Sequence, residues 1–248
     1  EIHDEERPAT TFDALYVNFD TFVAFLQDNP VWLQKIYGAK ERFIRSNERK
    51  AYSADFFGLY DESKREGRGQ IAFYYSTHFH QFICSRYPEF NQIPEIIDFF
   101  NACLEIQKPC GKVFIKAAAE LGIETLFSSK PPPVLLKVIK YLPSYSITRP
   151  HYDGSAFSLF LDSTDNQSLL LSPYKDSYAR DDFFSPHRQV PHSILLIPGA
   201  LLTEFSVYPT PHIVLKSGKI RYSTVAFAMR PNYTPGKIVL SPLPNIEH

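Results

Sequence analysis

The second half of the chain consists of short runs in which apolar and polar residues alternate. A β-strand places every second side chain on the same face, so this alternation predicts half-buried strands. The pattern predicts eight of them, at residues 135–142, 145–153, 156–161, 168–171, 193–197, 205–208, 212–215 and 220–229. Eight antiparallel strands fit a jelly roll, the double-stranded β-helix. The polar stretch 174–189 is expected to form a loop beside the pocket.

The first half shows a helical period instead. Apolar residues recur at spacings of three and four at Ile93, Ile96, Ile97, Phe100 and Leu104. This spacing predicts an amphipathic helix that Pro109 should kink or end, and the apolar stripe then continues to Gly122, a suitable C-cap.

Nearer the start of the chain, we expect an edge strand at 12–19, a helix at 20–26 and another helix beginning at Pro30. Residues 42–68 are charged with interspersed aromatic side chains, and we interpret them as an irregular surface segment with a few anchors. The predicted fold class is therefore α+β and mainly β. We expect one domain over residues 1–248, with a helical part at 1–133, a jelly-roll core at 134–231 and a tail at 232–248.

Two histidines and one aspartate are candidate metal ligands. His151 and Asp153 are two residues apart, so on a strand both project from one face. His212 lies downstream at the start of another predicted strand. Two histidines and one carboxylate with open coordination positions form the facial triad of non-haem Fe(II) oxygenases.

The residues after His212 predict an anion-binding group beside this metal. Ser217-Gly218 between two apolar runs is typical of a tight hairpin, in which His212 would face Ser223 and Val214 would face Arg221. A guanidinium on an apolar inner wall is costly unless it meets an anion, and its planar fork suits a carboxylate.

Three segments resemble the isopenicillin N synthase-like family of 2-oxoglutarate- and Fe(II)-dependent oxygenases. The run from His151 through Asp153 to Leu161 is similar to that family's H-T/S-D-x-G/S-x-L-T-L-L-L motif. Residues 197–202, Ile-Pro-Gly-Ala-Leu-Leu, resemble the strand leading to G-D-L-L. Arg221-Tyr-Ser223 matches the R-x-S motif, nine and eleven residues beyond His212.

The resemblance implies a mechanism and a set of roles. Fe(II) held by His151, Asp153 and His212 would chelate 2-oxoglutarate, whose distal carboxylate would be held by Arg221 and Ser223. Tyr141, in a segment similar to the family's N-Y-Y-P, is a displaced counterpart of a tyrosine that often contacts this co-substrate. The products would be succinate, carbon dioxide and an oxidised small molecule, by hydroxylation, desaturation or cyclisation.

Arg149 shares strand parity with His151 and is a further candidate. It either anchors the substrate or forms an ordinary structural ion pair. His78 and His80 could bind metal as a strand pair, but no suitably spaced third ligand follows them, so packing is the better interpretation.

Composition narrows the classes of function. The 248 residues are 44% hydrophobic, enough for a sizeable core, and the net charge of −1 argues against recruitment by nucleic acid or by an anionic membrane. Three cysteines without C-x-x-C spacing predict neither a disulfide framework nor a zinc site. With no signal peptide and no membrane-spanning run, we expect a cytoplasmic protein whose partners are a small-molecule substrate and O2.

Two alternatives stay open. One is an oxidase like isopenicillin N synthase, which uses the same ligands without 2-oxoglutarate. The other is a jelly-roll protein that binds a metabolite without turnover. Oxygen-dependent formation of succinate would separate the dioxygenase from both.

Overall fold

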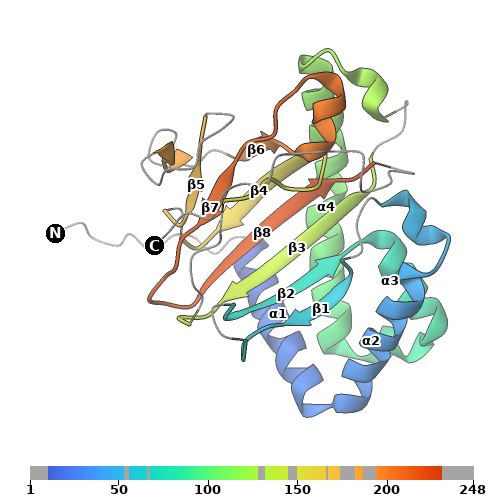
Figure 1. Ribbon diagram of the computed structural model, residues 1–248. Helices are drawn as coiled ribbons and strands as arrows, with labels where there is room; N and C mark the ends of the chain where they lie inside the picture. The colour runs from blue at the N-terminus through green and yellow to red at the C-terminus, as the bar shows by residue number, and fades with distance from the viewer. Residues whose placement is uncertain are drawn as a thin grey trace.

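The computed structural model describes residues 11–52, 56–65, 68–127, 132–144, 150–165, 167–173, 182–186 and 194–230. A six-stranded antiparallel sheet runs through the molecule in the order β1-β2-β3-β8-β4-β6, and β5 and β7 form a second, two-stranded sheet. Helices α1 and α4 lie behind the large sheet in Figure 1, and the small sheet lies on its other side. The predicted combination of a helical first half with a β-rich second half is confirmed.

Four helices make up most of the first half. Their bounds are Thr11–Asp28 for α1, Pro30–Ile44 for α2, Thr77–Arg86 for α3 and Pro94–Glu120 for α4. The described residues also include the short 3-10 helices η1 (Glu48–Ala51), η2 (Pro88–Gln92), η3 (Glu124–Phe127) and η5 (Ala200–Phe205). None of the helices in the described part of the chain is long and apolar enough to cross a membrane.

The start of the chain corrects one prediction. The expected edge strand at 12–19 is wrong, because these residues form the first turns of α1. Leu15, Phe19, Phe22 and Leu26 are all buried, and their spacing of three and four residues is helical, not alternating. Packing of this stripe against α4 and the sheet stabilises the helix.

The other helices follow their sequence signals. Pro30 occupies the first turn of α2, where a missing N–H costs nothing. Pro109 lies inside α4 without ending it. Gly122 follows the helix with a φ of 69°, the left-handed conformation expected of a C-terminal glycine. The N-terminal cap of α3 is Ser76, whose hydroxyl accepts a hydrogen bond from the Phe79 amide, so His78 and His80 are helical and not a strand pair.

The strands of the second half match most of the predicted runs. They are β3 (Val134–Tyr141), β4 (Phe157–Ser163), β5 (Leu169–Leu171), β6 (Leu195–Pro198), β7 (His212–Val214) and β8 (Arg221–Ala228). The strand expected at 205–208 is wrong. Its first residue ends η5, and Ser206 adopts a φ of 62°, which interrupts an extended chain. Of the strand expected at 145–153, residues 145–149 lie outside the described part, and residues 150–153 form no strand but only an isolated bridge at His151. Most of the loop at 174–189 and the tail at 232–248 also lie outside the described part.

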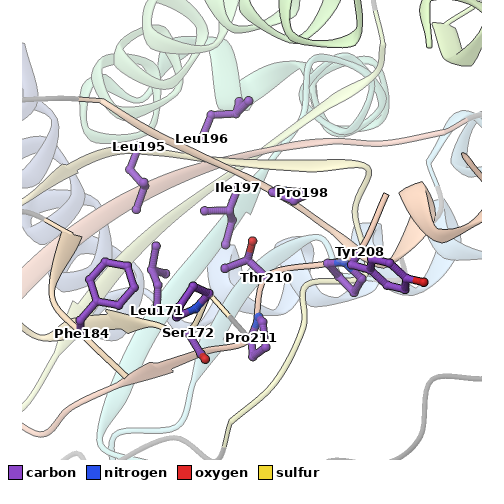
Figure 2. A pocket seen from close by; sticks show the side chains of 12 residues that line it. Leu171, Ser172, Phe184, Leu195, Leu196, Ile197, Pro198, Tyr208, Thr210 and Pro211 are labelled. Atoms are coloured by element: carbon purple, nitrogen blue, oxygen red, sulfur yellow. The ribbon is translucent and has the colours of Figure 1, made fainter. Parts of the chain in front are cut away.

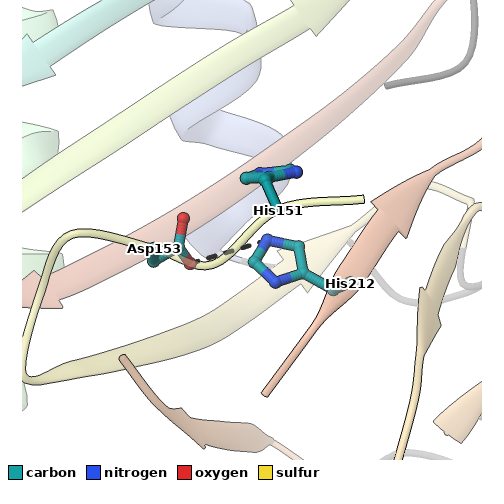
Figure 3. Close-up of side chains that lie close together, drawn as sticks. All are labelled: His151, Asp153 and His212. Carbon is teal, nitrogen blue, oxygen red and sulfur yellow. Dashed lines mark ion pairs between the residues drawn. The ribbon is translucent and has the colours of Figure 1, made fainter. Parts of the chain in front are cut away.

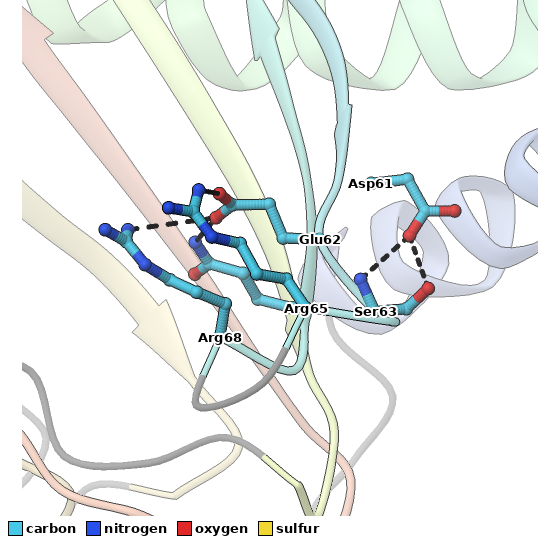
Figure 4. Close-up of polar contacts among 6 residues, drawn as sticks. Asp61, Glu62, Ser63, Arg65 and Arg68 are labelled. Atoms are coloured by element: carbon cyan, nitrogen blue, oxygen red, sulfur yellow. Dashed lines mark hydrogen bonds and ion pairs between the residues drawn. The ribbon is translucent and has the colours of Figure 1, made fainter.

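Two strands that the sequence did not predict extend the sheet. Residues 42–68 contain β1 (Gly58–Asp61), and β2 (Gln70–Tyr75) pairs with β3. Figure 4 shows that polar contacts organise the β1–β2 connection: Glu62 accepts hydrogen bonds from Arg65 at 3.0 Å and from Gln70 at 2.8 Å. The expectation of an irregular surface segment is therefore wrong for residues 58–61, which form a strand of the large sheet.

The predicted hairpin between β7 and β8 is also wrong. β7 pairs with β5, whereas β8 pairs with β3 and β4, so the two strands belong to different sheets. The connection at 215–220 turns from one sheet to the other, and the Leu215 amide donates a hydrogen bond to the Ser168 carbonyl. His212 and Val214 consequently lie on the small sheet, opposite the strand that carries Arg221 and Ser223.

Candidate metal centre

The three candidate ligands come from two chain segments that pair directly. His151 forms an isolated antiparallel bridge with His212, the first residue of β7. Each residue's amide donates a hydrogen bond to the other's carbonyl, at 3.1 and 3.0 Å. Their imidazole rings are 4.2 Å apart between centroids. Asp153 follows His151 by two residues, so one short piece of backbone brings both donors to His212.

The donor atoms of the three residues lie close together. One ligand atom from each of His151, Asp153 and His212 lies within 4.8 Å of the others. His212 Nε2 and Asp153 Oδ2 are 3.7 Å apart, too far for a hydrogen bond (Figure 3). Metal bonds to imidazole nitrogen and carboxylate oxygen of about 2.0–2.2 Å allow two ligands of one ion to be up to about 4.2 Å apart. The donor set and the 3.7 Å pair fit a divalent transition metal.

Hydrogen bonds orient both the carboxylate ligand and an imidazole ligand. The Ser158 hydroxyl donates to Asp153 Oδ2 at 2.6 Å, and a second serine, Ser155, lies 3.0 Å from Ser158. His212 Nδ1 lies 3.3 Å from the Thr210 carbonyl oxygen. A proton held on Nδ1 by that carbonyl leaves the Nε2 lone pair directed at the metal position.

Electrostatics favour the ionised form of Asp153. Burial raises the pKa of this carboxyl group, but His212, His151 and the Ser158 hydroxyl oppose the effect, and the net result is a lowered pKa. The group is therefore a carboxylate at neutral pH, which is the form that binds a metal.

The predicted anion-binding residues lie on the large sheet. Arg221 and Ser223 are buried and alternate along β8, on the sheet face turned away from α1 and α4. Tyr141 is the register partner of Arg221 on β3, and the guanidinium carbon lies 3.8 Å from the centre of its ring. Arg221 also donates a hydrogen bond to the Leu215 carbonyl at 3.1 Å. Val214 of β7 packs against the cluster containing Tyr141, so the strand that carries His212 faces this wall.

Two residues around the triad were missed by the sequence analysis. Ser158 supports Asp153, and Lys137 on β3 contributes a positive charge near it. The alternation along β3 could have revealed Lys137, because it has the same parity as Tyr141. Arg149, the predicted substrate anchor, lies outside the described residues.

An apolar cleft of about 360 Å³ lies between β5, β6 and the stretch at 208–211 (Figure 2). Leu171, Phe184 and Ile197 line it, and so does Thr210, whose carbonyl contacts His212. The cleft contains none of the three candidate ligands. It lies next to the small sheet, beside the Thr210 carbonyl that contacts His212.

Comparison with known proteins identifies the fold. No family model and no curated protein matches the chain. Among solved structures, dioxygenase for auxin oxidation 1 from Arabidopsis thaliana, a complex with 2-oxoglutarate, has a TM-score of 0.52 and 17% identity, over 87% of this chain and 86% of that one. JOX2, solved with 2OG, Fe and JA, has a TM-score of 0.53 and 19% identity, over 95% of this chain and 69% of that one. The fold is thus the double-stranded β-helix of 2-oxoglutarate oxygenases, as the resemblance implied.

Proposed function

We propose that this protein is a non-haem Fe(II)- and 2-oxoglutarate-dependent dioxygenase that oxidises a small molecule. The observation that carries the proposal is the convergence of His151, Asp153 and His212 inside a fold shared with proteins solved with 2-oxoglutarate or Fe. Two imidazoles and one carboxylate leave coordination positions for a chelating co-substrate and for O2.

Each group of residues has a role in this proposal. His151, Asp153 and His212 hold Fe(II), and Ser158 and the Thr210 carbonyl orient two of these ligands. Arg221, Ser223 and Tyr141 hold the distal carboxylate of 2-oxoglutarate. When bound, Fe(II) supplies the dioxygen chemistry that converts 2-oxoglutarate and O2 to succinate and carbon dioxide while the substrate is oxidised.

The surroundings support this assignment. Arg221 is almost completely buried, with 3% of its surface exposed, and the desolvation of a guanidinium is offset best by an anion. The triad lies between two sheets, which limits water around the reacting groups. Cys84, Cys103 and Cys110 are free thiols, and this supports a reducing compartment such as the cytoplasm, in which Fe(II) persists.

Anaerobic calorimetric titration with Fe(II), followed by 2-oxoglutarate, tests the proposal. We expect one Fe(II) per chain and 2-oxoglutarate binding that requires the metal. His212→Ala and Asp153→Ala should abolish stoichiometric Fe(II) binding, because each removes one of three protein ligands. His78→Ala is the matched control, since His78 is exposed and contacts Tyr52 away from the site.

Oxygen consumption then separates the classes of function. A dioxygenase forms succinate from 2-oxoglutarate only when O2 is admitted. Substrate oxidation without succinate would favour the oxidase, and ligand binding without O2 consumption would favour a binding protein. Unchanged Fe(II) affinity in both alanine variants would refute the triad.

A further inference from the structure

We propose that Lys137 binds a carboxylate of the oxidised substrate, so that this substrate is an organic acid. The inference rests on the proposed function, because it treats the triad and Arg221 as the sites of the metal and of 2-oxoglutarate. It adds a second anion position on the same inner wall.

Strand β3 directs Lys137 toward the triad. Leu136 and Val138 on either side of it are fully buried in the core beneath the helices. Lys137 therefore projects from the opposite face, together with Ile139 and Tyr141. Strand alternation thus places an ammonium group on the wall that the triad faces.

The neighbours of Lys137 are a phenol and the candidate metal ligand. Tyr74 is its register partner on β2, and the ammonium nitrogen lies 5.2 Å from the centre of the Tyr74 ring. Burial lowers the pKa of Lys137, but Tyr74, Tyr141 and Asp153 oppose this and raise the pKa above its ordinary value, so the side chain is charged. In the described part of the chain, no carboxylate forms a salt bridge with it.

Lys137 and Arg221 start from well-separated backbone positions on the inner wall. Arg221 is the register partner of Tyr141, which is four residues from Lys137 on the same strand. At about 3.3 Å per residue, the two backbone positions are roughly 13 Å apart along the sheet. The two cations therefore enter the inner wall from different points, and the proposal assigns one anionic group to each.

The positive charge of the side chains on the inner wall favours the binding of a second anion. Lys137 and Arg221 are the charged side chains on the inner face of the described strands of the large sheet. Together with Fe(II) and the Asp153 carboxylate, these two described side chains would sum to a charge of +3. Dianionic 2-oxoglutarate reduces this to +1, and a monocarboxylate substrate makes the site neutral. An uncompensated charge between two sheets is costly, so a neutral site is favoured.

Aromatic side chains next to Lys137 suit the body of such an acid. Phe56 stacks on Tyr74 with ring centres 5.5 Å apart, and Tyr60 meets Tyr74 edge-on at 5.2 Å. Phe56 is 52% exposed, so this aromatic group extends from the surface to the partner of Lys137. A flat apolar body would pack on these rings while its carboxylate reaches the ammonium group.

The test uses acids paired with uncharged amides. Phenylacetate, 3-phenylpropanoate and 4-phenylbutanoate, each with its primary amide, are titrated by ligand-observed NMR into protein loaded with Mn(II) and 2-oxoglutarate. We expect at least one acid to bind about 10-fold or more tightly than its amide, the effect of a charge-assisted hydrogen bond. Lys137→Met should abolish the preference, and Lys137→Arg should keep most of it.

Lys140→Met is the matched control. Lys140 lies on the same strand but contacts Asp20, on the helix side of the sheet, so its loss should leave the acid preference unchanged. Thermal unfolding of each variant shows whether it is folded, and Lys137→Gln replaces Lys137→Met if the methionine variant is not.

The outcomes separate the inference from the proposed function. Wild-type protein that binds neither Mn(II) nor 2-oxoglutarate contradicts both. If loading succeeds, the inference alone is wrong when no acid is preferred or when Lys137→Met keeps the preference. Loss of 2-oxoglutarate binding in Lys137→Met would assign Lys137 to the co-substrate and would also overturn the inference.

Discussion

At the scale of single residues, the candidate metal centre depends on few contacts, each of a different kind. Backbone pairing fixes His151 against His212, whereas a serine hydroxyl orients Asp153. The imidazole of His212 is held by a carbonyl two residues away. Because hydrogen bonds and sheet pairing hold the donors before any ion binds, little ordering remains to be done on metal binding.

Arg221→Ala should weaken 2-oxoglutarate binding and leave Fe(II) binding unchanged. A lost charge-assisted contact costs about 1.5–3 kcal/mol, or roughly 10-fold to 100-fold in Kd. Anaerobic calorimetry of the Fe(II)-loaded variant measures both constants. Arg65→Ala is the control, since Arg65 is exposed on the β1–β2 connection. If Arg221→Ala binds 2-oxoglutarate with wild-type affinity, the anion site lies elsewhere.

At the scale of elements, the end of β6 holds the segment that carries Asp153. The amides of Gly199, Ala200 and Leu201 donate hydrogen bonds to the carbonyls of Ala156, Asp153 and Ser155, at 2.8, 2.8 and 3.1 Å. This close approach requires a glycine, because a Cβ on Gly199 would lie 2.2 Å from the Ser155 carbonyl oxygen. Geometry at the metal centre thus depends on a contact between two distant segments.

Gly199→Ala should therefore destabilise the fold and weaken metal binding together. Overpacking of this kind typically costs about 1–3 kcal/mol. The 155–156 backbone must move, and Asp153 moves with it. Urea unfolding gives the free energy, and Fe(II) titration gives the metal affinity. Gly154→Ala is the control, because nothing lies within 4 Å of its added Cβ. Equal stability of the two variants would show that the contact is not needed.

At the scale of the whole molecule, two sheets share one site. His151 and Asp153 precede β4 of the large sheet, and His212 begins β7 of the small one. Behind the large sheet, an aromatic core that includes Phe22, Phe73 and Phe99 packs α1 and α4 against the strands. A metal ion at the triad would join the small sheet to this rigid body.

Metal binding should consequently stabilise the entire fold. Mn(II) at 100 times its Kd adds about 2.7 kcal/mol to the free energy of unfolding, which for a chain of this size raises Tm by roughly 5–11 °C. Differential scanning calorimetry with Mn(II), and again after addition of EDTA, measures the shift and its reversal. Asp153→Ala should show no shift, and an equal shift in that variant would place the stabilising ion at another site.

The candidate metal ligands, the candidate anion-binding residues and most strands of the second half could be predicted from local sequence patterns. Arg221 and Ser223 are two residues apart on β8, so strand alternation places both on one face. His151 and Asp153 are also two residues apart, but they lie at an isolated bridge and not on a strand. The way in which these pairs come together follows from the folded arrangement of the two sheets. The assignment of β7 and β8 to different sheets, the helical form of residues 12–19 and the position of Lys137 beside Tyr74 depend on packing between segments far apart in the chain. Local periodicity predicts on which face of a strand a residue lies. The pairing of strands far apart in the chain determines which residues that face contacts.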